Sequence, residues 1–289
     1  TGLPPRDSGI WSNEEADDEG VRRSIFRDPS LALVTPSGGV GVGAGPLPLR
    51  ARTVADRLRE ARPDAVILSF SMKDRAAILG AGRRPTLALW FDRDLDTFAT
   101  STAYGREFPE WATPIVGHDA LVARRRTPWS PLDPVWLDQV ARGVPDDGPG
   151  EGDLSGFGTT FPHDVNASKE PPRAFRAAPF GDAAVLALAR EAITRLARDD
   201  APLFVALSLS ANDYIGHLFG SGSRESWDNL LRLDGELARF FAFLDGKYGR
   251  DGWSVMLAAD HGAQHAIVHR LYHGQLRQDL DAAAVRDLG

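Results

Sequence analysis

The sequence predicts an α/β fold, with a mostly parallel sheet flanked by helices on both faces and a loop-rich insertion. Short apolar runs of strand length alternate with amphipathic stretches of helical length, a pattern typical of a parallel sheet covered on both sides. The chain has 289 residues, of which 43% are hydrophobic and 25% charged, an ordinary globular balance. This length suffices for one large domain or two modest ones.

The N-terminal part contains loops before its first regular elements. Residues 36–48 are rich in glycine and proline and are predicted to form a loop. A helix is expected after Thr53, because the threonine hydroxyl can cap its first turn. Three apolar runs then predict strands at 64–70, 85–91 and 97–104.

Residues 105–180 have a different character. They contain many proline, glycine and tryptophan residues and one short predicted helix, at 134–142. Such a long stretch with little periodicity is typical of an inserted cap. We therefore expect a catalytic core made of residues 1–104 and 181–289, interrupted by a cap-like insertion.

Regular patterns return after the insertion. Asp182 is expected to cap a helix, which leads into a strand at 203–210. A long amphipathic helix is predicted at 223–248 and a buried strand at 253–259, and a last helix is expected from about Gly274.

Composition excludes several classes of partner and site. There are 33 basic and 40 acidic residues, giving a net charge of −7, so no basic field predicts binding to a nucleic acid polymer. Cysteine is absent, so a metal would have to be held by histidines and carboxylates. The sequence contains no run of about 18 apolar residues, so no membrane span is predicted. Composition leaves the oligomeric state open.

Two carboxylate–histidine pairs follow two of the predicted strands. Asp213 and His217 come just after the strand at 203–210, and Asp260 and His261 directly follow the one at 253–259. Ligands of open α/β sheets bind at the carboxyl ends of strands, so we expect the four side chains to converge on divalent ions. For either pair alone, a helix cap with solvated surface histidines is the favoured alternative.

Further histidines recur at every fourth position after His261, namely His265, His269 and His273. A helical stripe of ligands is one interpretation. Placement in a loop or on the surface is preferred, because no apolar strand precedes these residues. Only His261 is retained as a candidate ligand.

Several motifs resemble the alkaline phosphatase superfamily, and most of all its type I phosphodiesterase/nucleotide pyrophosphatase branch. The segments SANDYIGHLFG, LLRLDGELARFFAFLD and VMLAADHG carry the main resemblance. TGLPPRDSGIWSN is similar to a family segment in which a histidine stands at the position of Ser8. SFSMKDRAAIL and LWFDRDLDTFATSTAY resemble the zinc alkaline phosphatases of the phosphate-irrepressible type. The resemblance covers nearly the whole chain and is weakest across 105–180.

The resemblance implies two zinc ions, with other divalent ions as alternatives. Asp213 and His217 would bind one ion, and Asp260 and His261 the other. It also implies a small-molecule phosphate ester as substrate, and a periplasmic or secreted location.

The same resemblance assigns phosphate contacts to three residues. Asn13 would donate to a phosphate oxygen beside the nucleophile, and Lys73 and Arg75 would bind the non-bridging oxygens. A phosphate monoester is a dianion near neutral pH, so two adjacent cations favour monoesters over singly charged diesters. The alternative is that Lys73 and Arg75 are solvated turn residues on either side of Asp74.

The implied activity is hydrolysis of phosphate monoesters through a phosphorylated threonine or serine. By motif spacing the nucleophile is expected roughly nine residues before Thr1, a further metal aspartate upstream of it, and a remaining zinc histidine beyond Gly289. The chain by itself is therefore expected to bind zinc weakly and to be inactive. The alternatives are a phosphodiesterase or nucleotide pyrophosphatase, and a degenerate, non-catalytic metal-binding member.

Overall fold

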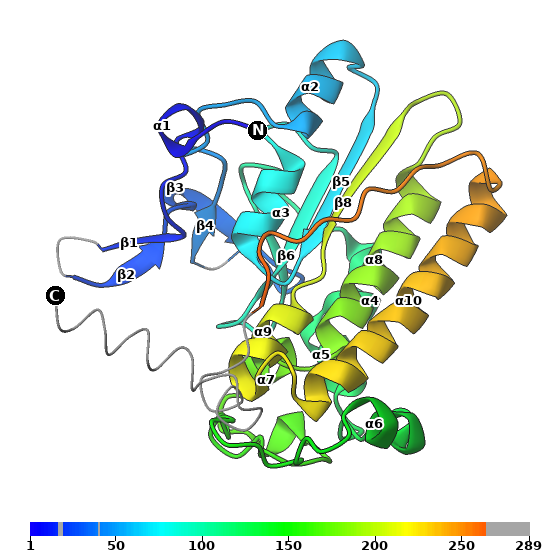
Figure 1. Ribbon diagram of the computed structural model, residues 1–289. Helices are drawn as coiled ribbons and strands as arrows, with labels where there is room; N and C mark the ends of the chain where they lie inside the picture. The colour runs from blue at the N-terminus through cyan, green and yellow to red at the C-terminus, as the bar shows by residue number, and fades with distance from the viewer. Residues whose placement is uncertain (17–19, 40, 264–289) are drawn as a thin grey trace, which may run out of the picture. The chain divides into compact units, whose positions relative to one another are not determined.

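The computed structural model describes residues 1–16, 20–39 and 41–263, and the chain divides into two compact units (Figure 1). The first unit comprises Thr1–Arg124 and Gly181–Ser210, and the second comprises Arg125–Phe180 and Ala211–Gly289. The predicted insertion at 105–180 is thus divided between the two units. Its role as a cap stays a prediction.

A six-stranded mixed sheet forms the centre of the first unit, with strand order β4-β3-β7-β6-β5-β8. The fold class is confirmed, but only β6, β5 and β8 run parallel; β7, β3 and β4 add antiparallel pairs. A turn at 93–96 joins β6 directly to β7, and so short a connection permits only antiparallel pairing. The strands are β3 (Arg27–Val34), β4 (Val42–Ala44), β5 (Val66–Ser71), β6 (Leu87–Asp92), β7 (Thr97–Ser101) and β8 (Leu203–Ser208).

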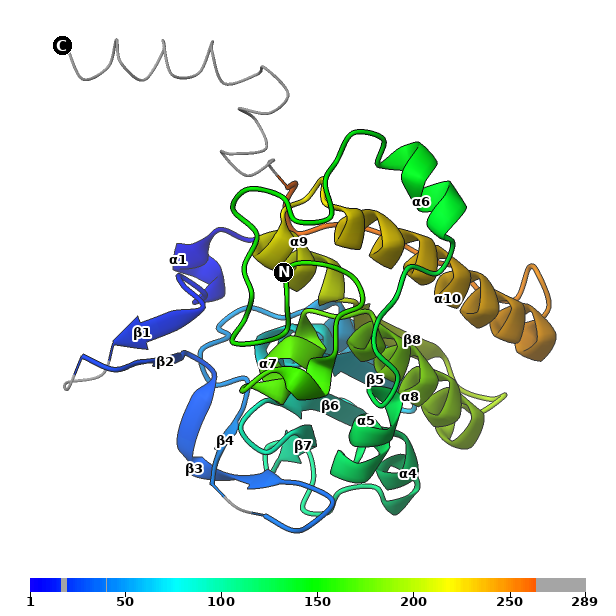
Figure 2. The ribbon, with the colours of Figure 1, turned by 90° about the horizontal axis from the view of Figure 1, so that it is seen from below.

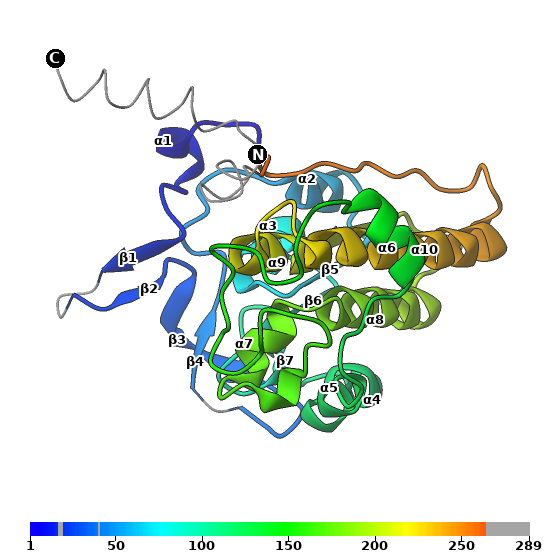
Figure 3. The same cartoon turned by 60° about the horizontal axis from the view of Figure 1, so that its bottom comes forward.

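Helices cover both faces of this sheet, as predicted. Figure 3 shows α2 and α3 on one side of β5 and β6, and α4, α5 and α8 on the other. Every residue of β5 is buried, which is why the strand is mostly apolar and its polar residues are small serines. The helices are α2 (Val54–Ala61), α3 (Asp74–Ala81), α4 (Thr113–Val116), α5 (His118–Arg124) and α8 (Phe180–Leu196), with a 3-10 turn at Glu110–Ala112.

The predicted helix caps were right for α2 and wrong for α8. Thr53 caps α2 in a reciprocal arrangement: its hydroxyl accepts from the Asp56 amide and its own amide donates to the Asp56 carboxylate. Helix α8 begins at Phe180, two residues before the predicted cap. Asp182 lies inside its first turn, where a carboxylate is stabilised by the positive end of the helix without capping it.

The stretch 36–48, predicted to be a loop, contains the edge strand β4. Its glycines permit this strand. A β-carbon at Gly43 would stand 2.8 Å from the Ala32 carbonyl oxygen and 2.9 Å from the Ser101 β-carbon. The absence of a side chain therefore lets β4 close onto β3, while composition alone indicated a loop.

The strand predicted at 253–259 was also wrong. This segment has no regular structure, and Val255, Met256 and Leu257 are exposed, Met256 by 93%. A buried strand needs a ladder partner and a covering layer, both of which are non-local. Within the described ranges this segment pairs with no strand. The helix expected from Gly274 lies outside the described residues, as do His265, His269 and His273.

Helices α9 and α10 dominate the second unit and pack against each other, and α6 packs on α10 (Figure 2). Ser223 caps α10, which spans the range predicted for it. None of the helices in the described part of the chain combines the length and apolarity needed to cross a bilayer. The helices of this unit are α6 (Pro134–Val140), α7 (Pro171–Arg176), α9 (Ala211–Phe219) and α10 (Arg224–Tyr248), with a 3-10 turn at Val165–Ala167.

The Asp228 carboxylate joins the irregular segment after residue 125 to α10. Asp228 is buried and accepts from the Trp129 indole, the Leu132 amide and the Arg232 guanidinium, each at 2.6 Å. Three short bonds to one carboxylate compensate for burying its charge, and they fix the segment against the helix.

We expect Asp228→Ala to lower the stability of the protein by about 3 kcal/mol, because it leaves the buried Trp129 indole and the Leu132 amide without this acceptor and the Arg232 guanidinium without its carboxylate partner. Thermal unfolding should show a Tm lower by roughly 10 °C. Asp234→Ala, on an exposed position of the same helix, is the matched control. Equal Tm values for the two variants would contradict this account.

Candidate functional site

The two predicted phosphate-binding cations stand where β5 passes into α3. Strand β5 ends at Ser71, whose hydroxyl oxygen accepts from the Lys73 amide at 2.9 Å. Lys73 is the extended residue that precedes α3, and Arg75 lies in the first helical turn. Both are only partly exposed. The positive end of a helix adds to their charge, so this turn favours an anion.

Asn13 belongs to the same unit and is exposed just before β1 (Glu14–Ala16), which pairs with β2 (Arg22–Ser24). The Asn13 carbonyl oxygen accepts from the Ile25 amide at 3.2 Å. Next to Ile25, the Ser24 hydroxyl donates to the Asp74 carboxylate at 2.9 Å. The backbone of Asn13 is thus connected through two hydrogen bonds to the turn that carries Lys73 and Arg75. The phosphate-binding roles of the three residues stay predictions.

In the second unit, Asp213 and His217 lie one turn apart on α9. The distance from Asp213 Oδ1 to His217 Nε2 is 3.3 Å. Positions four apart face the same side of a helix, which is why this pair could be recognised from sequence.

His261 approaches the same carboxylate from the irregular segment after α10. Its Nε2 is 3.6 Å from Asp213 Oδ1 and 3.8 Å from Asp260 Oδ2. The His217 and His261 side chains are 76% and 58% exposed, while Asp213 is 24% exposed. The structure therefore brings His217 and His261 to the Asp213 carboxylate, whereas Asp260 is placed only near His261.

The Asp213 and His217 donor atoms are separated by a distance that would let them bind the same divalent ion. Oxygen and nitrogen donors about 2.0–2.1 Å from a tetrahedral zinc lie roughly 3.3 Å from each other, and the Asp213–His217 separation is 3.3 Å. His261 Nδ1 lies 3.0 Å from the Gly262 carbonyl oxygen. A proton donated there leaves the Nε2 lone pair free to bind metal. In the described part of the chain, no group of three such side chains is arranged around one ion. The two-zinc arrangement stays a prediction.

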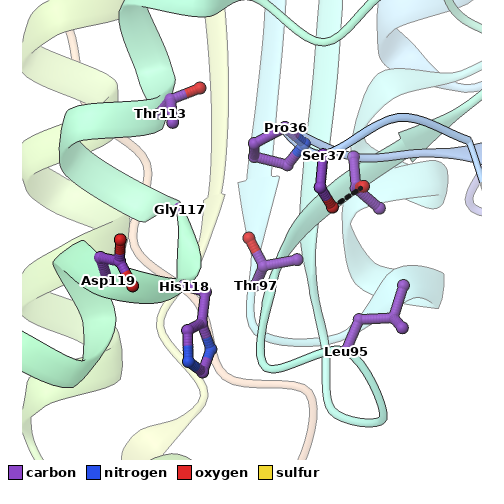
Figure 4. A pocket seen from close by; sticks show the side chains of 9 residues that line it. Pro36, Ser37, Leu95, Thr97, Thr113, Gly117, His118 and Asp119 are labelled. Carbon is purple, nitrogen blue, oxygen red and sulfur yellow. Dashed lines mark hydrogen bonds between the residues drawn. The ribbon is translucent and has the colours of Figure 1, made fainter.

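A shallow pocket of about 380 Å³ in the first unit contains none of the predicted site residues (Figure 4). His118 and Asp119, at the start of α5, face the loop after β3 and the turn before β7 across it. His118 Nδ1 lies 3.2 Å from the Asp96 carbonyl oxygen. This contact orients the ring towards the protein, and we assign the pocket no role.

A buried acid distinguishes the second unit. Neither carboxylate oxygen of Glu151 has a hydrogen-bond partner. Burial, and next the charge of Glu225, raise the pKa of Glu151 to about 8. Glu225 is fully buried, and its Oε1 lies 3.0 Å from His163 Nε2. Both effects favour the neutral, protonated form of Glu151.

The chain belongs to the type I phosphodiesterase / nucleotide pyrophosphatase family, whose match spans residues 88–282. It is 35% identical to alkaline phosphatase PafA of Elizabethkingia meningoseptica, over 97% of this chain and 53% of PafA. It is 33% identical to a protein of Myroides odoratus named calcium-transporting ATPase, over 92% of this chain and 50% of that protein. Alkaline phosphatase PhoV of Synechococcus elongatus is 33% identical, over 92% of this chain and 49% of PhoV.

Crystal structures of PafA share the fold. The wild-type structure superposes with a TM-score of 0.83 at 32% identity, covering 99% of this chain and 57% of PafA. A variant substituted at a threonine, an asparagine, a lysine and an arginine gives 0.85 at 34% identity, covering 95% and 54%. The predicted family and fold are thus confirmed. The chain spans about half the length of the curated relatives it matches.

The raised pKa of Glu151 predicts a pH-dependent stability. The unfolded chain releases this proton near pH 4.5 and the folded chain near 8. The folded state therefore binds more protons in this window, and stability falls as the pH rises through it. We expect a contribution of about 1–2 kcal/mol, allowing for partial solvent screening.

Glu151→Gln, which keeps the neutral form, should remove this part of the decline in Tm between pH 5 and pH 9. Glu170→Gln, at an exposed position of the same unit, is the control and should follow the wild type. An unchanged pH profile in the Glu151 variant would show that the carboxyl group is ionised at neutral pH.

Proposed function

We propose that the protein carrying this chain is a divalent-metal-dependent phosphate monoester hydrolase of the alkaline phosphatase type. The observation that carries this proposal is the turn between β5 and α3, where Lys73 and Arg75 flank the first residue of a helix. The family match and the relatives named alkaline phosphatases support the same reaction class.

The charge of this turn suits a monoester. A monoester dianion gains from two cations together with a helix N-terminus, and guanidinium can bind two phosphate oxygens at once. Lys73 supplies a compact point charge and Arg75 a planar pair of donors. In the substituted PafA structure the altered lysine and arginine are two positions apart, which is also the spacing of Lys73 and Arg75.

Asn13 would donate its side-chain amide to a further phosphate oxygen. It is exposed, and its backbone is connected to the Lys73–Arg75 turn through Ile25, Ser24 and Asp74. An amide and two cations fixed in advance can hold the equatorial oxygens while charge redistributes. In phosphoryl transfer, such positioning and electrostatic stabilisation are most of the protein's contribution to catalysis.

Two divalent ions, zinc in this proposal, would be held by Asp213, His217, Asp260 and His261. The N/O donor set and the separations around Asp213 Oδ1 fit this class of ion. When bound, such ions lower the pKa of a hydroxyl nucleophile and stabilise the leaving oxygen. None of the described residues is assigned as the nucleophile.

The second candidate function is hydrolysis of phosphodiesters or nucleotide pyrophosphates, which the family description favours. The two candidates differ in the charge of the substrate, since a diester carries one negative charge and needs fewer cations. Either substrate would be a small-molecule phosphate ester. A periplasmic or secreted location is part of the proposal and rests on the resemblance to alkaline phosphatases.

Lys73→Ala in the full-length protein should lower kcat/KM for para-nitrophenyl phosphate by about 100-fold, and for bis-para-nitrophenyl phosphate by less than about 10-fold. The reason is that the doubly charged substrate depends more on the second cation. Arg93→Ala, an exposed arginine of the same unit, controls for the loss of positive charge. A greater loss for the diester would favour the phosphodiesterase, and a wild type inactive on both esters would refute the proposal.

Asp213→Ala should weaken zinc binding at least about 10-fold in isothermal titration of metal-depleted protein. The reason is that Asp213 Oδ1 lies within 3.3 Å of His217 Nε2 and 3.6 Å of His261 Nε2. Asp234→Ala, which removes an exposed carboxylate from α10, should leave the affinity unchanged. Equal zinc affinity in the two variants would exclude Asp213 as a ligand.

A further inference from the structure

The position of Asn13 has little support from its own surroundings. Residues 11–16 are all exposed, and among the described strands β1 pairs with β2 alone, in a separate two-stranded sheet. Figure 1 shows this small sheet at the edge of the first unit, projecting away from the main sheet. A residue on such a segment can bind phosphate in a fixed geometry only if the segment is attached to the rest of the site.

The attachment lies at Ser24 and Ile25, where β2 ends. The Ile25 amide donates to the Asn13 carbonyl oxygen at 3.2 Å. The Ile25 side chain packs against a core cluster that includes Ile78 of α3 and Trp90 of β6. The apolar contact holds the end of the small sheet on α3, but it gives no direction to the side chains around it.

The Ser24–Asp74 hydrogen bond supplies that direction. The Phe26 amide donates to the Ser24 hydroxyl oxygen at 3.3 Å, which leaves the hydroxyl proton free to be donated to Asp74 Oδ2 at 2.9 Å. Asp74 is the first residue of α3, between the two cations. The bond therefore runs directly from the segment of Asn13 to the turn of Lys73 and Arg75.

An acidic residue between two phosphate-binding cations is otherwise unfavourable. A carboxylate there would repel a bound dianion and compete for the two cations. Its hydrogen bond to Ser24 directs one oxygen towards β2. Asp74 thus accepts a hydrogen bond from Ser24 that a residue without an acceptor atom, such as alanine, could not form.

We propose that Asp74 is a positioning residue: through Ser24 it fixes Asn13 relative to Lys73 and Arg75, so that the amide and the cations bind oxygens of the same phosphate. This inference rests on the proposed function. It extends that function by naming two residues, Ser24 and Asp74, that do not touch the substrate.

A double-mutant cycle with Asn13 tests this role in the full-length protein. Ser24→Ala should lower kcat/KM for para-nitrophenyl phosphate about 10-fold and weaken inhibition by inorganic phosphate. In the Asn13→Ala background the same change should have less than about a twofold effect, because the group it positions is gone. Asp74→Ala should behave like Ser24→Ala. Asp74→Asn, which keeps an acceptor oxygen, should retain most of the activity.

Ser30→Ala is the matched control, since it removes an exposed hydroxyl that donates to Asp28 in the neighbouring strand β3. An active wild type in which Ser24→Ala has no effect, or the same effect with and without Asn13, would overturn this inference and leave the proposed function intact. A wild type inactive on phosphate esters would overturn both.

Discussion

The structure depends above all on the burial of β5 between two parallel neighbours. All six residues of β5 are buried, and its last residue, Ser71, pairs with Ser208 of β8. The two strands therefore end level with each other at one edge of the sheet. Along the chain, the first is followed after two residues by α3 with its cations, and the second after two residues by α9 with Asp213. Strand register thus sets where each functional segment begins.

Sequence reasoning succeeded where the signal was local. Buried strands such as β5 appear as continuous apolar runs, and the cap at Thr53 depends on residues three positions apart. It failed where stability came from distant partners. Strand β4 forms because Gly43 fits against β3 and β7, and the apolar segment 253–259 is not a strand among the described residues, although its pattern indicated one.

The candidate site shows the same division. The Asp213–His217 pair follows from helical spacing, whereas the approach of His261 to Asp213 was expected for a reason the structure does not support. The prediction placed Asp260 and His261 at a strand end, yet they follow an irregular segment. The Ser24–Asp74 bond joins residues 50 positions apart, and no pattern in the sequence predicts it. Its only signal was the unexplained acid between Lys73 and Arg75.

The proposed phosphate site depends on local charge rather than on the net charge of −7. Two acids near the β5–α3 turn accept hydrogen bonds from neighbouring groups. Asp74 accepts from Ser24, and Asp92 accepts from the amides of Asp94 and Leu95. Burial, with smaller contributions from the charges of Asp94 and then Asp74, raises the pKa of Asp92 and so disfavours its ionised form. Lys73, Arg75 and the start of α3 bring positive charge to this turn of an acidic protein. In the proposed function, such a site would gain more from a dianion than from a monoanion, and for this reason the proposal favours monoesters over diesters.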